Sequence, residues 1–310
     1  MGAGLYQAPL IQYARRDHHI TVCSNNPHDL AAQDGHTFYP ISTADIDGIT
    51  SLAQELKPDG ILTTASDIAI HTISKLPATL RSPLYDSSLI QLTGDKLSLR
   101  HHLAQYQLSD LHFREDTPPH DEDWLVKPRF SSGGRGIGLV SLQDHNAEAS
   151  NTYGHGIFYE QEVKGSHHGA IAVIHERSLQ QLFVTDKSID RHFRTKTHRY
   201  PSAIFAESQQ KQLFEYIQLF VDSLPGTSYL MDIDLIYTKK RFEIIEAGVR
   251  LSGNGLTDLI IKATGFPLYE CAIRWSLGML PIAPYSVNNI TPAMCTVERG
   301  GNESFSLYNL

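Results

Sequence analysis

The sequence predicts an α/β segment followed by an α+β segment, and two observations carry this prediction. In residues 1–80, short apolar runs alternate with stretches whose apolar residues recur at helical spacing, the pattern of parallel strands joined by helices. From residue 124 onward, several strand-like runs follow one another with few helices between them, which is typical of antiparallel strands with helices on one side. The 310 residues allow two domains, or one domain with subdomains.

The N-terminal elements follow from the spacing of apolar residues and from the turn residues that end each run. The helices expected in this part cover residues 5–16, 45–56 and 69–76. The strands expected in this part cover residues 19–24, 38–41 and 60–64.

The remaining elements follow from the same signals. Thr93 is expected to cap a helix that begins at Gly94 or Asp95 and ends near Gln105. The strands expected after it cover residues 124–128, 137–140, 157–163, 170–175, 182–186, 229–237 and 241–247. The helices expected after it cover residues 209–224, 257–265 and 268–277.

Composition excludes several classes of protein. The net charge is −8 and no basic stripe is visible, which argues against a nucleic-acid partner. No apolar run approaches the roughly 18 residues that span a bilayer, so no membrane partner is expected. Cys23, Cys271 and Cys295 are far apart and form neither a disulfide framework nor a zinc motif, and a cytoplasmic location is expected.

The segment from Trp124 to Val140 combines a lysine with a glycine loop. Lys127 lies on the expected strand 124–128, and residues 131–136 (Ser-Ser-Gly-Gly-Arg-Gly) lead back into a second strand. A Walker A loop would instead end in its lysine and lead into a helix. Backbone without Cβ atoms can approach phosphate oxygens and cradle them with N–H groups, so we favour a phosphate-binding hairpin over a plain surface hairpin.

Carboxylates on neighbouring strands suggest a metal site. Asp232 and Asp234 share one face of the strand 229–237, and Glu246 ends the strand that follows it. Asp234 faces Glu246 if an odd number of residues, such as 239–241, forms the turn between the strands. Two carboxylates on one face suit Mg²⁺, which shares its other positions with phosphates and water. A solvated polar face is the alternative, and it fits poorly with the two isoleucines before Glu246.

These motifs occur in one order along the chain, and that order resembles the ATP-grasp ligases. The sequence that precedes residue 90 resembles the pre-ATP-grasp domain of that family, notably at Gly-Ala-Gly-Leu-Tyr-Gln and at Thr64-Ala-Ser-Asp67. The resemblance implies a Rossmann-like pre-ATP-grasp domain over residues 1–90 and then a two-subdomain ATP-grasp fold. Its small lid subdomain would cover 91–160, and its C-terminal subdomain with the metal and substrate site would cover 161–310.

The resemblance also implies roles for individual residues. Lys127 and Arg250 match the catalytic residues, and Asp234 and Glu246 match the Mg²⁺ ligands. Gln161 and Val163 would offer backbone groups to adenine. The ATP-binding positions are Lys96, Lys127, Ser131, Ser132, Gly133, Gly134, Gly136, Glu160, Gln161, Glu162, Val163 and His167. The substrate positions are Arg250, Ser252, Gly253 and Asn254.

Two departures from the family pattern stand out. The family often ends its metal motif as Glu-x-Asn-x-Arg, and this chain has Glu246-Ala-Gly-Val-Arg250, so Gly248 offers no side-chain ligand. His167 stands where a ribose-binding glutamate is common. The basic stretch 190–202, with Arg191, Arg194, Arg199 and Tyr200, suggests an anionic acid as substrate.

The function that the resemblance implies is an ATP-dependent carboxylate–amine ligase that forms an amide through an acyl phosphate and releases ADP and phosphate. The cofactors would be ATP and one or two Mg²⁺ ions, for which Mn²⁺ can substitute. The partners would be a small-molecule carboxylate and an amine, and a homodimer is allowed. One alternative is a catalytically degenerate nucleotide-binding protein. Another is a carboxylase or an enzyme similar to carbamoyl-phosphate synthase, which would use bicarbonate.

Overall fold

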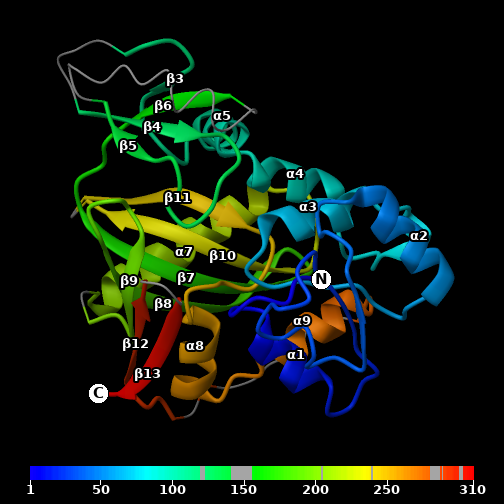
Figure 1. The fold of residues 1–310 in the computed structure, drawn as a ribbon. Coiled ribbons are helices and arrows are strands. Elements are labelled where there is room, and N and C mark those ends of the chain that lie inside the picture. Colours follow the sequence, from blue (N-terminus) through cyan, green and yellow to red (C-terminus); the bar gives the residue numbers. More distant parts are fainter. Residues whose placement is uncertain are drawn as a thin grey trace.

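Two antiparallel sheets and a helical N-terminal segment, arranged as Figure 1 shows, contribute the residues that line one central space. The computed structural model describes residues 1–118, 123–140, 156–203, 205–238, 240–279, 287, 289–299 and 303–310. The four-stranded sheet lies at the top of Figure 1, the seven-stranded sheet crosses its middle, and the N-terminal helices lie to the right. This mixed α/β architecture agrees with the predicted fold class.

The N-terminal segment contains the helices that apolar spacing predicts. They are α1 (Ala8–Ala14), α2 (Ile46–Leu56) and α3 (Asp67–Lys75). It also contains two elements that were not predicted, a short 3-10 turn (Ala78–Leu80) and α4 (Ser87–Gly94). Asp45 caps α2 by accepting from the N–H of Gly48, and Ser66 caps α3 by accepting from the N–H of Ala69. Strands β1 (Thr21–Cys23) and β2 (Thr37–Tyr39) pair in parallel, as the alternating pattern predicts.

The strand expected over residues 60–64 is not formed. The Met1 amino group donates to the Leu62 carbonyl at 2.7 Å, and the N–H of Gly2 donates to the Cys23 carbonyl at 2.8 Å. Residues 1–3 therefore run between β1 and residues 61–63. These are single hydrogen bonds rather than a ladder, so residues 60–64 stay extended without becoming a strand.

The cap of the next helix lies two residues later than expected. Thr93 belongs to α4, which the sequence analysis missed, and its hydroxyl donates to the Leu89 carbonyl at 3.0 Å. Helix α5 (Lys96–Gln105) is capped instead by Asp95, whose carboxylate accepts from the N–H of Leu97 at 3.1 Å. This boundary matters for the site because it puts Lys96 in the first turn of α5.

The smaller sheet forms the upper wall of the central space. Its strands are β3 (Phe113–Arg114), β4 (Trp124–Pro128), β5 (Gly138–Leu139) and β6 (Ile157–Gln161), in the order β3-β6-β4-β5. Strands β4 and β5 pair antiparallel, with Val126 opposite Gly138, so the predicted hairpin around the glycine loop is confirmed.

The larger sheet forms the floor. Its strands are β7 (Ser166–His175), β8 (Ser178–Ile189), β9 (Thr195–Tyr200), β10 (Tyr229–Tyr237), β11 (Phe242–Gly248), β12 (Ala293–Glu298) and β13 (Ser304–Asn309). Their order is β11-β10-β7-β8-β9-β12-β13, and every neighbouring pair is antiparallel.

Helices cover both faces of this sheet, so the expectation of helices on one side is wrong. Helix α7 (Glu207–Ser223) packs on the face that includes Ala170 and Ala172. Helices α8 (Leu256–Thr264) and α9 (Leu268–Ser276) pack on the face that includes Ile171 and Val173. The unbroken apolar run of β7 at residues 169–174 is the sequence signal of a strand buried on both faces. None of the helices that the structure describes has the length and hydropathy to cross a membrane.

The register between β10 and β11 depends on a β-bulge. Tyr237 pairs with Phe242, which leaves an even number of residues, 238–241, in the turn rather than the expected odd number. The register then shifts between Asp234 and Leu235, so that Ile245 is skipped and Asp234 pairs with Glu246. The expected pairing of the two carboxylates is therefore correct, although the reason given for it is wrong.

Candidate active site

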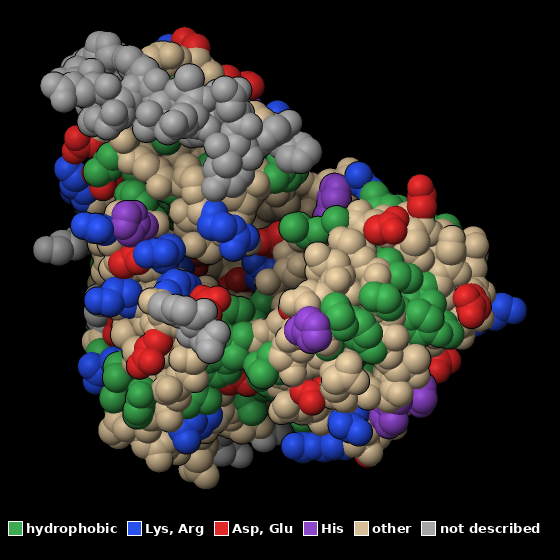
Figure 2. All heavy atoms as spheres, in the orientation of Figure 1, with side chains coloured by type: hydrophobic (Ala, Val, Ile, Leu, Met, Phe, Trp, Pro, Cys, Tyr) green, Lys and Arg blue, Asp and Glu red, His purple; other side chains and the backbone are tan. Residues whose placement is uncertain are grey.

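A cleft of about 1660 Å³ lies between the two sheets and the N-terminal segment. Figure 2 shows it as the hollow at the centre of this face, with acidic and basic side chains gathered around it. Every sequence-predicted site residue that carries a phosphate, metal or substrate role lines this cleft except Lys96, Gly136 and Gln161. Lys96 contacts two residues that do line it, Ser131 and Glu246. The cleft thus brings together predicted site residues that lie up to 127 positions apart, from Lys127 to Asn254.

Lys127 and Glu160 form the buried upper wall. Lys127 on β4 donates to the Oε1 carboxylate oxygen of Glu160 on β6, and the two side chains are 4 % and 2 % exposed. The Oε2 atom of Glu160 lies 3.0 Å from Nε of Arg100 on α5. Burial alone would raise the pKa of Glu160, but the charges of Lys127 and Arg100 outweigh it and lower the pKa.

Arg100 is a site residue that the sequence analysis missed. Its Nη2 atom donates to the carbonyls of Ile244 and Ile245 at 2.5 and 2.6 Å, so it connects α5 to β11 at the bulge. Lys96 lies one turn earlier on α5 and points to the same side, where its Nζ lies 3.3 Å from Oε1 of Glu246. The i, i+4 spacing of these two cations was the available signal.

The glycine loop, residues 131–136, covers the cleft from the upper side. The Ser131 carbonyl accepts from Lys96, and the Ser132 hydroxyl accepts from Arg135 at 2.7 Å. Gly133, Gly134 and Gly136 have φ angles of 64°, 78° and 75°, a region that strongly favours glycine. The backbone conformation therefore explains the three glycines independently of any ligand.

The segment after β6 is engaged more closely than expected. The N–H of Gln161 donates to the His112 carbonyl at 2.9 Å, and the N–H of Glu162 donates to the Asp123 carbonyl at 2.8 Å. Among the hydrogen bonds within the described residues, none involves the N–H of Val163, which lines the cleft. Of the two residues expected to offer backbone groups to adenine, only Val163 therefore has an N–H that is not already bonded within the described residues.

His167 and Lys187 lie opposite each other on β7 and β8 and both line the cleft. Lys187, a second residue that the sequence analysis missed, donates to Oδ2 of Asp234 at 2.6 Å. Burial and the charge of Lys187 lower the pKa of His167, so its ring is neutral near pH 7. Alternation along β8 carried no signal for Lys187, because a lysine in a strand is usually a solvated one.

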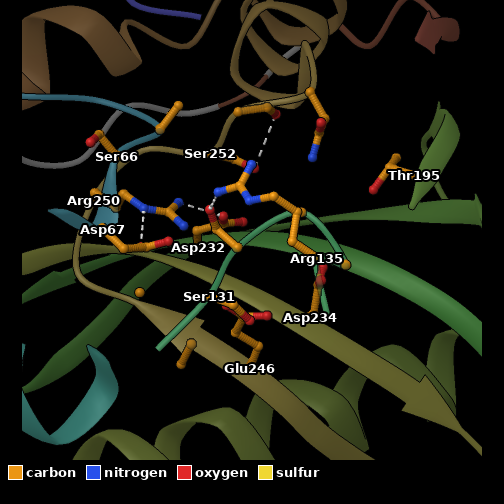
Figure 3. Close-up of a pocket in the computed structure, with 18 of the residues that line it drawn as sticks. Ser66, Asp67, Ser131, Arg135, Thr195, Asp232, Asp234, Glu246, Arg250 and Ser252 are labelled. Atoms are coloured by element: carbon orange, nitrogen blue, oxygen red, sulfur yellow. Dashed lines mark hydrogen bonds and ion pairs between the residues drawn. The ribbon is translucent and has the colours of Figure 1, made fainter. Parts of the chain in front are cut away.

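Asp234 and Glu246 face each other on the floor of the cleft (Figure 3). Burial alone would raise the pKa of Asp234, but Lys187 outweighs it and lowers the pKa. Each carboxylate has a lysine as its partner, Lys187 for Asp234 and Lys96 for Glu246. No group of three or more His, Cys, Asp or Glu side chains suited to a metal ion is found within the described residues. Two carboxylates that share the rest of the coordination with phosphate oxygens fit Mg²⁺.

Arg250 lies between two carboxylates (Figure 3). Its Nε donates to Oδ1 of Asp67 at 2.7 Å, and its Nη1 donates to Oδ2 of Asp232 at 2.7 Å. Burial alone would lower the pKa of Arg250, but these two charges raise it. Burial raises the pKa of Asp232 to about 6, although Arg250 opposes this. Asp67 begins α3, so Arg250 joins the floor of the cleft to the N-terminal segment.

The substrate-side residues 252–254 are held by neighbouring side chains. Ser252 is buried and its carbonyl accepts from Thr257 at 2.9 Å. An added Cβ on Gly253 would lie 3.0 Å from Cβ of Ala65, so this position is tight. The side-chain oxygen of Asn254 accepts from Arg299 at 3.0 Å, and Arg299 also contacts Glu303 at 2.9 Å. Arg299 and Glu303 line the cleft and were not predicted.

The basic stretch 190–202 does not present a basic surface to the cleft. Arg194 is the only one of its three arginines that lines the cleft, and it is paired with Asp190 at 2.9 Å. Arg191 and Arg199 are exposed, and Tyr200 is part of the core. The argument for an anionic substrate from this stretch therefore has no support in the geometry.

A family model described as an ATP-grasp domain matches residues 93–254, which is more than half of the chain. The chain belongs to the ATP-grasp family. A search of curated protein sequences finds no match. The ATP-grasp identity and fold that the order of motifs predicts are thus confirmed.

Solved structures show the same fold at low sequence identity. Phosphoribosylglycinamide synthetase from Anaerococcus prevotii superposes with a TM-score of 0.76 at 14 % identity, over 96 % of this chain and 79 % of that one. L-amino acid ligase from Bacillus licheniformis gives 0.76 at 16 % identity, over 94 % and 77 %. N5-carboxyaminoimidazole synthetase from Staphylococcus aureus, complexed with ADP, gives 0.75 at 15 % identity, over 96 % and 80 %.

Proposed function

We propose that this ATP-grasp protein is an ATP-dependent carboxylate–amine ligase that activates its acid as an acyl phosphate. The observation that carries the proposal is one cleft with Lys127 and a glycine loop above and two facing carboxylates below, with Lys96 in contact with both the loop and Glu246. Cations and glycine backbone suit a polyphosphate, and the carboxylates suit the divalent ion that accompanies it. The named ligases and synthetases that share the fold support the same reading.

In the proposed nucleotide site, Lys96 and Lys127 would neutralise phosphate oxygens, and residues 131–136 would fold over them. Both lysines now contact carboxylates, Glu246 and Glu160, and an ammonium has three N–H donors. Each can therefore add a phosphate contact without giving up its present partner. The backbone N–H of Val163 would donate to adenine. His167, which lies on β7 and is neutral, would lie near the ribose.

Asp234 and Glu246 would hold Mg²⁺, for which Mn²⁺ can substitute. The metal would supply charge stabilisation for the transferred phosphoryl group. Their lysine partners keep both carboxylates from lying unpaired in the cleft. Gly248, opposite Asp232, offers no side-chain oxygen, and the side-chain oxygen of Asn254 is already bonded to Arg299.

The proposed reaction has two steps. A carboxylate oxygen of the acid attacks the γ-phosphorus of ATP, and the bond to the β,γ-bridging oxygen breaks to release ADP. The amine then attacks the acyl carbon, phosphate leaves with the electrons of the C–O bond, and the amine loses a proton. Arg250, held by Asp67 and Asp232, would face the charge that develops on the acyl oxygen, together with Ser252 and Gly253.

The test is a screen for ADP release with pools of carboxylic acids crossed with pools of amines, at fixed Mg²⁺. ADP release should need an acid and Mg²⁺, and hydroxylamine should trap the acyl phosphate as a hydroxamate. The Lys127→Met variant should lose activity, and the matched control Lys164→Met should keep it, because Lys164 is 74 % exposed and outside the cleft. ADP release at full rate with neither substrate, or with bicarbonate alone, would contradict the ligase reading, and no release with any pool would favour a nucleotide-binding protein without activity.

A further inference from the structure

The turn between β8 and β9, residues 190–194, is held by the side chain of Asp190 together with backbone hydrogen bonds. Oδ1 of Asp190 accepts from the N–H groups of His192 and Arg194 at 2.8 and 3.0 Å. Oδ2 accepts from Nε of Arg194 at 3.0 Å. The backbone closes the turn as well, because the N–H of Asp190 donates to the Arg194 carbonyl at 2.8 Å. Phe193 has a φ of 59°, which a non-glycine residue keeps only when its surroundings impose it.

This turn lies directly against the glycine loop. A Cβ added to Gly134 would lie 2.8 Å from the carbonyl oxygen of Phe193 and 3.0 Å from that of His192. Its neighbour Gly133 has a similar φ, 64° against 78°, but a Cβ there would meet nothing within 4 Å. The absence of a side chain at Gly134 therefore serves a close backbone approach, whereas at Gly133 only the φ angle favours glycine.

The contact joins the two walls of the cleft. Gly134 and Arg135 belong to the hairpin of the upper sheet, and Phe193 and Arg194 belong to the turn between two strands of the floor sheet, yet all four line the same cleft. A surface hairpin without a function would have no need of a shaped partner on another sheet. The conformation that Asp190 imposes on the turn places the carbonyl groups of His192 and Phe193 so close to position 134 that only glycine fits there.

We propose that the turn 190–194 is a docking element that positions the glycine loop over the nucleotide, with Asp190 as a positioning residue. The inference rests on the proposed ATP site and adds a part to it. The turn would contact the loop rather than ATP, and it would act by limiting how far the loop can open. ATP binding should therefore depend on residues of the floor sheet that make no contact with phosphate.

Two alanine variants separate the contact from backbone strain. Gly133→Ala and Gly134→Ala carry a comparable φ penalty, but only the second places a Cβ against backbone atoms that cannot rotate away. Forcing extra atoms into a packed site costs about 1–3 kcal/mol, so the Kd for ATP should rise about fivefold or more in Gly134→Ala relative to Gly133→Ala. Calorimetry with ATP and Mg²⁺ measures both.

A series at Asp190 separates the shape of the turn from its charge. Asparagine keeps an oxygen that can accept from the N–H groups of His192 and Arg194, but alanine does not. Asp190→Asn should stay within about threefold of the wild-type Kd for ATP, and Asp190→Ala should weaken it like Gly134→Ala. A role through the ion pair with Arg194 would instead make the two variants alike.

Trypsin reports the position of the loop itself, because Arg135 is exposed and lies in it. ATP with Mg²⁺ should protect the Arg135–Gly136 bond in the wild type and in Asp190→Asn, and should protect it poorly in Gly134→Ala and Asp190→Ala, as mass spectrometry of the fragments shows. Equal ATP affinity and equal protection in Gly134→Ala and Gly133→Ala would overturn the docking turn alone. A wild-type protein that binds no ATP would overturn the proposed function together with it.

Discussion

The buried ion cluster of Arg100, Lys127 and Glu160 makes the sharpest test of the site, because stability and ATP binding depend on different members. The three side chains are 1 %, 4 % and 2 % exposed. Glu160 contacts Lys127 through Oε1 and Arg100 through Oε2, and the latter pair lies 3.0 Å apart without hydrogen-bond alignment. Two cations thus share one carboxylate, and the cluster carries a net charge of +1.

The charges that each substitution leaves behind set the expected magnitudes. Glu160→Gln leaves two buried cations with no carboxylate between them, and breaking a buried pair in this way costs about 3–5 kcal/mol. Lys127→Met leaves the neutral pair of Glu160 and Arg100 and keeps the volume of the side chain. Its free energy of unfolding should therefore fall by about 1 kcal/mol or less. Removing a charged hydrogen bond to phosphate costs about 1.5–3 kcal/mol, so the Kd for ATP should rise at least ~10-fold in Lys127→Met.

The assay combines thermal unfolding without nucleotide and calorimetric titration with ATP and Mg²⁺. At roughly 2 °C for each kcal/mol in a chain of this size, Glu160→Gln should lower the unfolding midpoint by about 6–10 °C. Lys127→Met should unfold near the wild-type temperature and bind ATP weakly. Lys164→Met is the matched control, since its side chain is 74 % exposed and its partner Asp123 lies at the surface.

Two results would refute this reasoning. If Lys127→Met destabilises the fold as much as Glu160→Gln does, then the charge balance of the cluster is not the controlling quantity. If Lys127→Met folds normally and binds ATP with wild-type affinity, then Lys127 belongs to the frame of the small sheet and not to the phosphate site.

Three shorter predictions concern the floor and the docking turn. Glu246→Gln should abolish ADP release in a protein with a native circular dichroism spectrum, because its charge is the larger part of the proposed metal site; an active variant removes Glu246 from that site. Gly248→Asn should lower the concentration of free Mg²⁺ needed for half-maximal rate at fixed MgATP, since it adds an oxygen beside the proposed ligands. An unchanged Mg²⁺ dependence in a folded variant would show that the missing side-chain oxygen at position 248 does not weaken metal binding. Burial alone would raise the pKa of Asp190, but hydrogen bonds from the N–H groups of Arg194 and His192 lower the pKa to about 2. A carboxyl whose pKa is lower in the folded state stabilises the fold at pH values above its pKa in the unfolded chain. In denaturant melts, the free energy of unfolding of the wild type should therefore exceed that of Asp190→Ala by its full amount above about pH 4, and by less as the pH falls through 2. A difference that does not change with pH contradicts this prediction.

The sequence predicted the elements whose signals are local. The limits of β4 and β10 agree with the structure, because an apolar run bounded by turn residues defines a strand without reference to its neighbours. The strand predicted over residues 60–64 does not form. Whether an extended segment becomes a strand depends on hydrogen bonds from residues far away in the sequence. The pairing of Asp234 with Glu246 was reached through an incorrect turn length, because a bulge leaves no mark in the apolar pattern.

The site shows a similar division. Residues on recognisable motifs, such as Lys127 before the glycine loop, were found and line the cleft. Arg100, Lys187 and Asp67 were not assigned roles, because each acts through a partner on another element: Glu160, Asp234 and Arg250. Such partners are set by tertiary packing, and a single sequence does not show them.

Gly248 illustrates how a departure from a family pattern can have a structural reason of its own. Gly248 is an extended strand residue, so its φ angle requires no glycine. A Cβ built there would lie 3.4 Å from the guanidinium carbon of Arg250, which places that side chain directly over the glycine. The guanidinium reaches Asp67 and Asp232 from this position. A longer side chain at position 248 would occupy the same space as the Arg250 guanidinium. An asparagine that adds an oxygen to the proposed metal site would therefore also contact the arginine that is proposed to face the acyl group. A substitution at Gly248 should therefore affect both the proposed metal site and Arg250. Its effect should be measured as a change in the KM for the acid as well as in the dependence of the rate on free Mg²⁺.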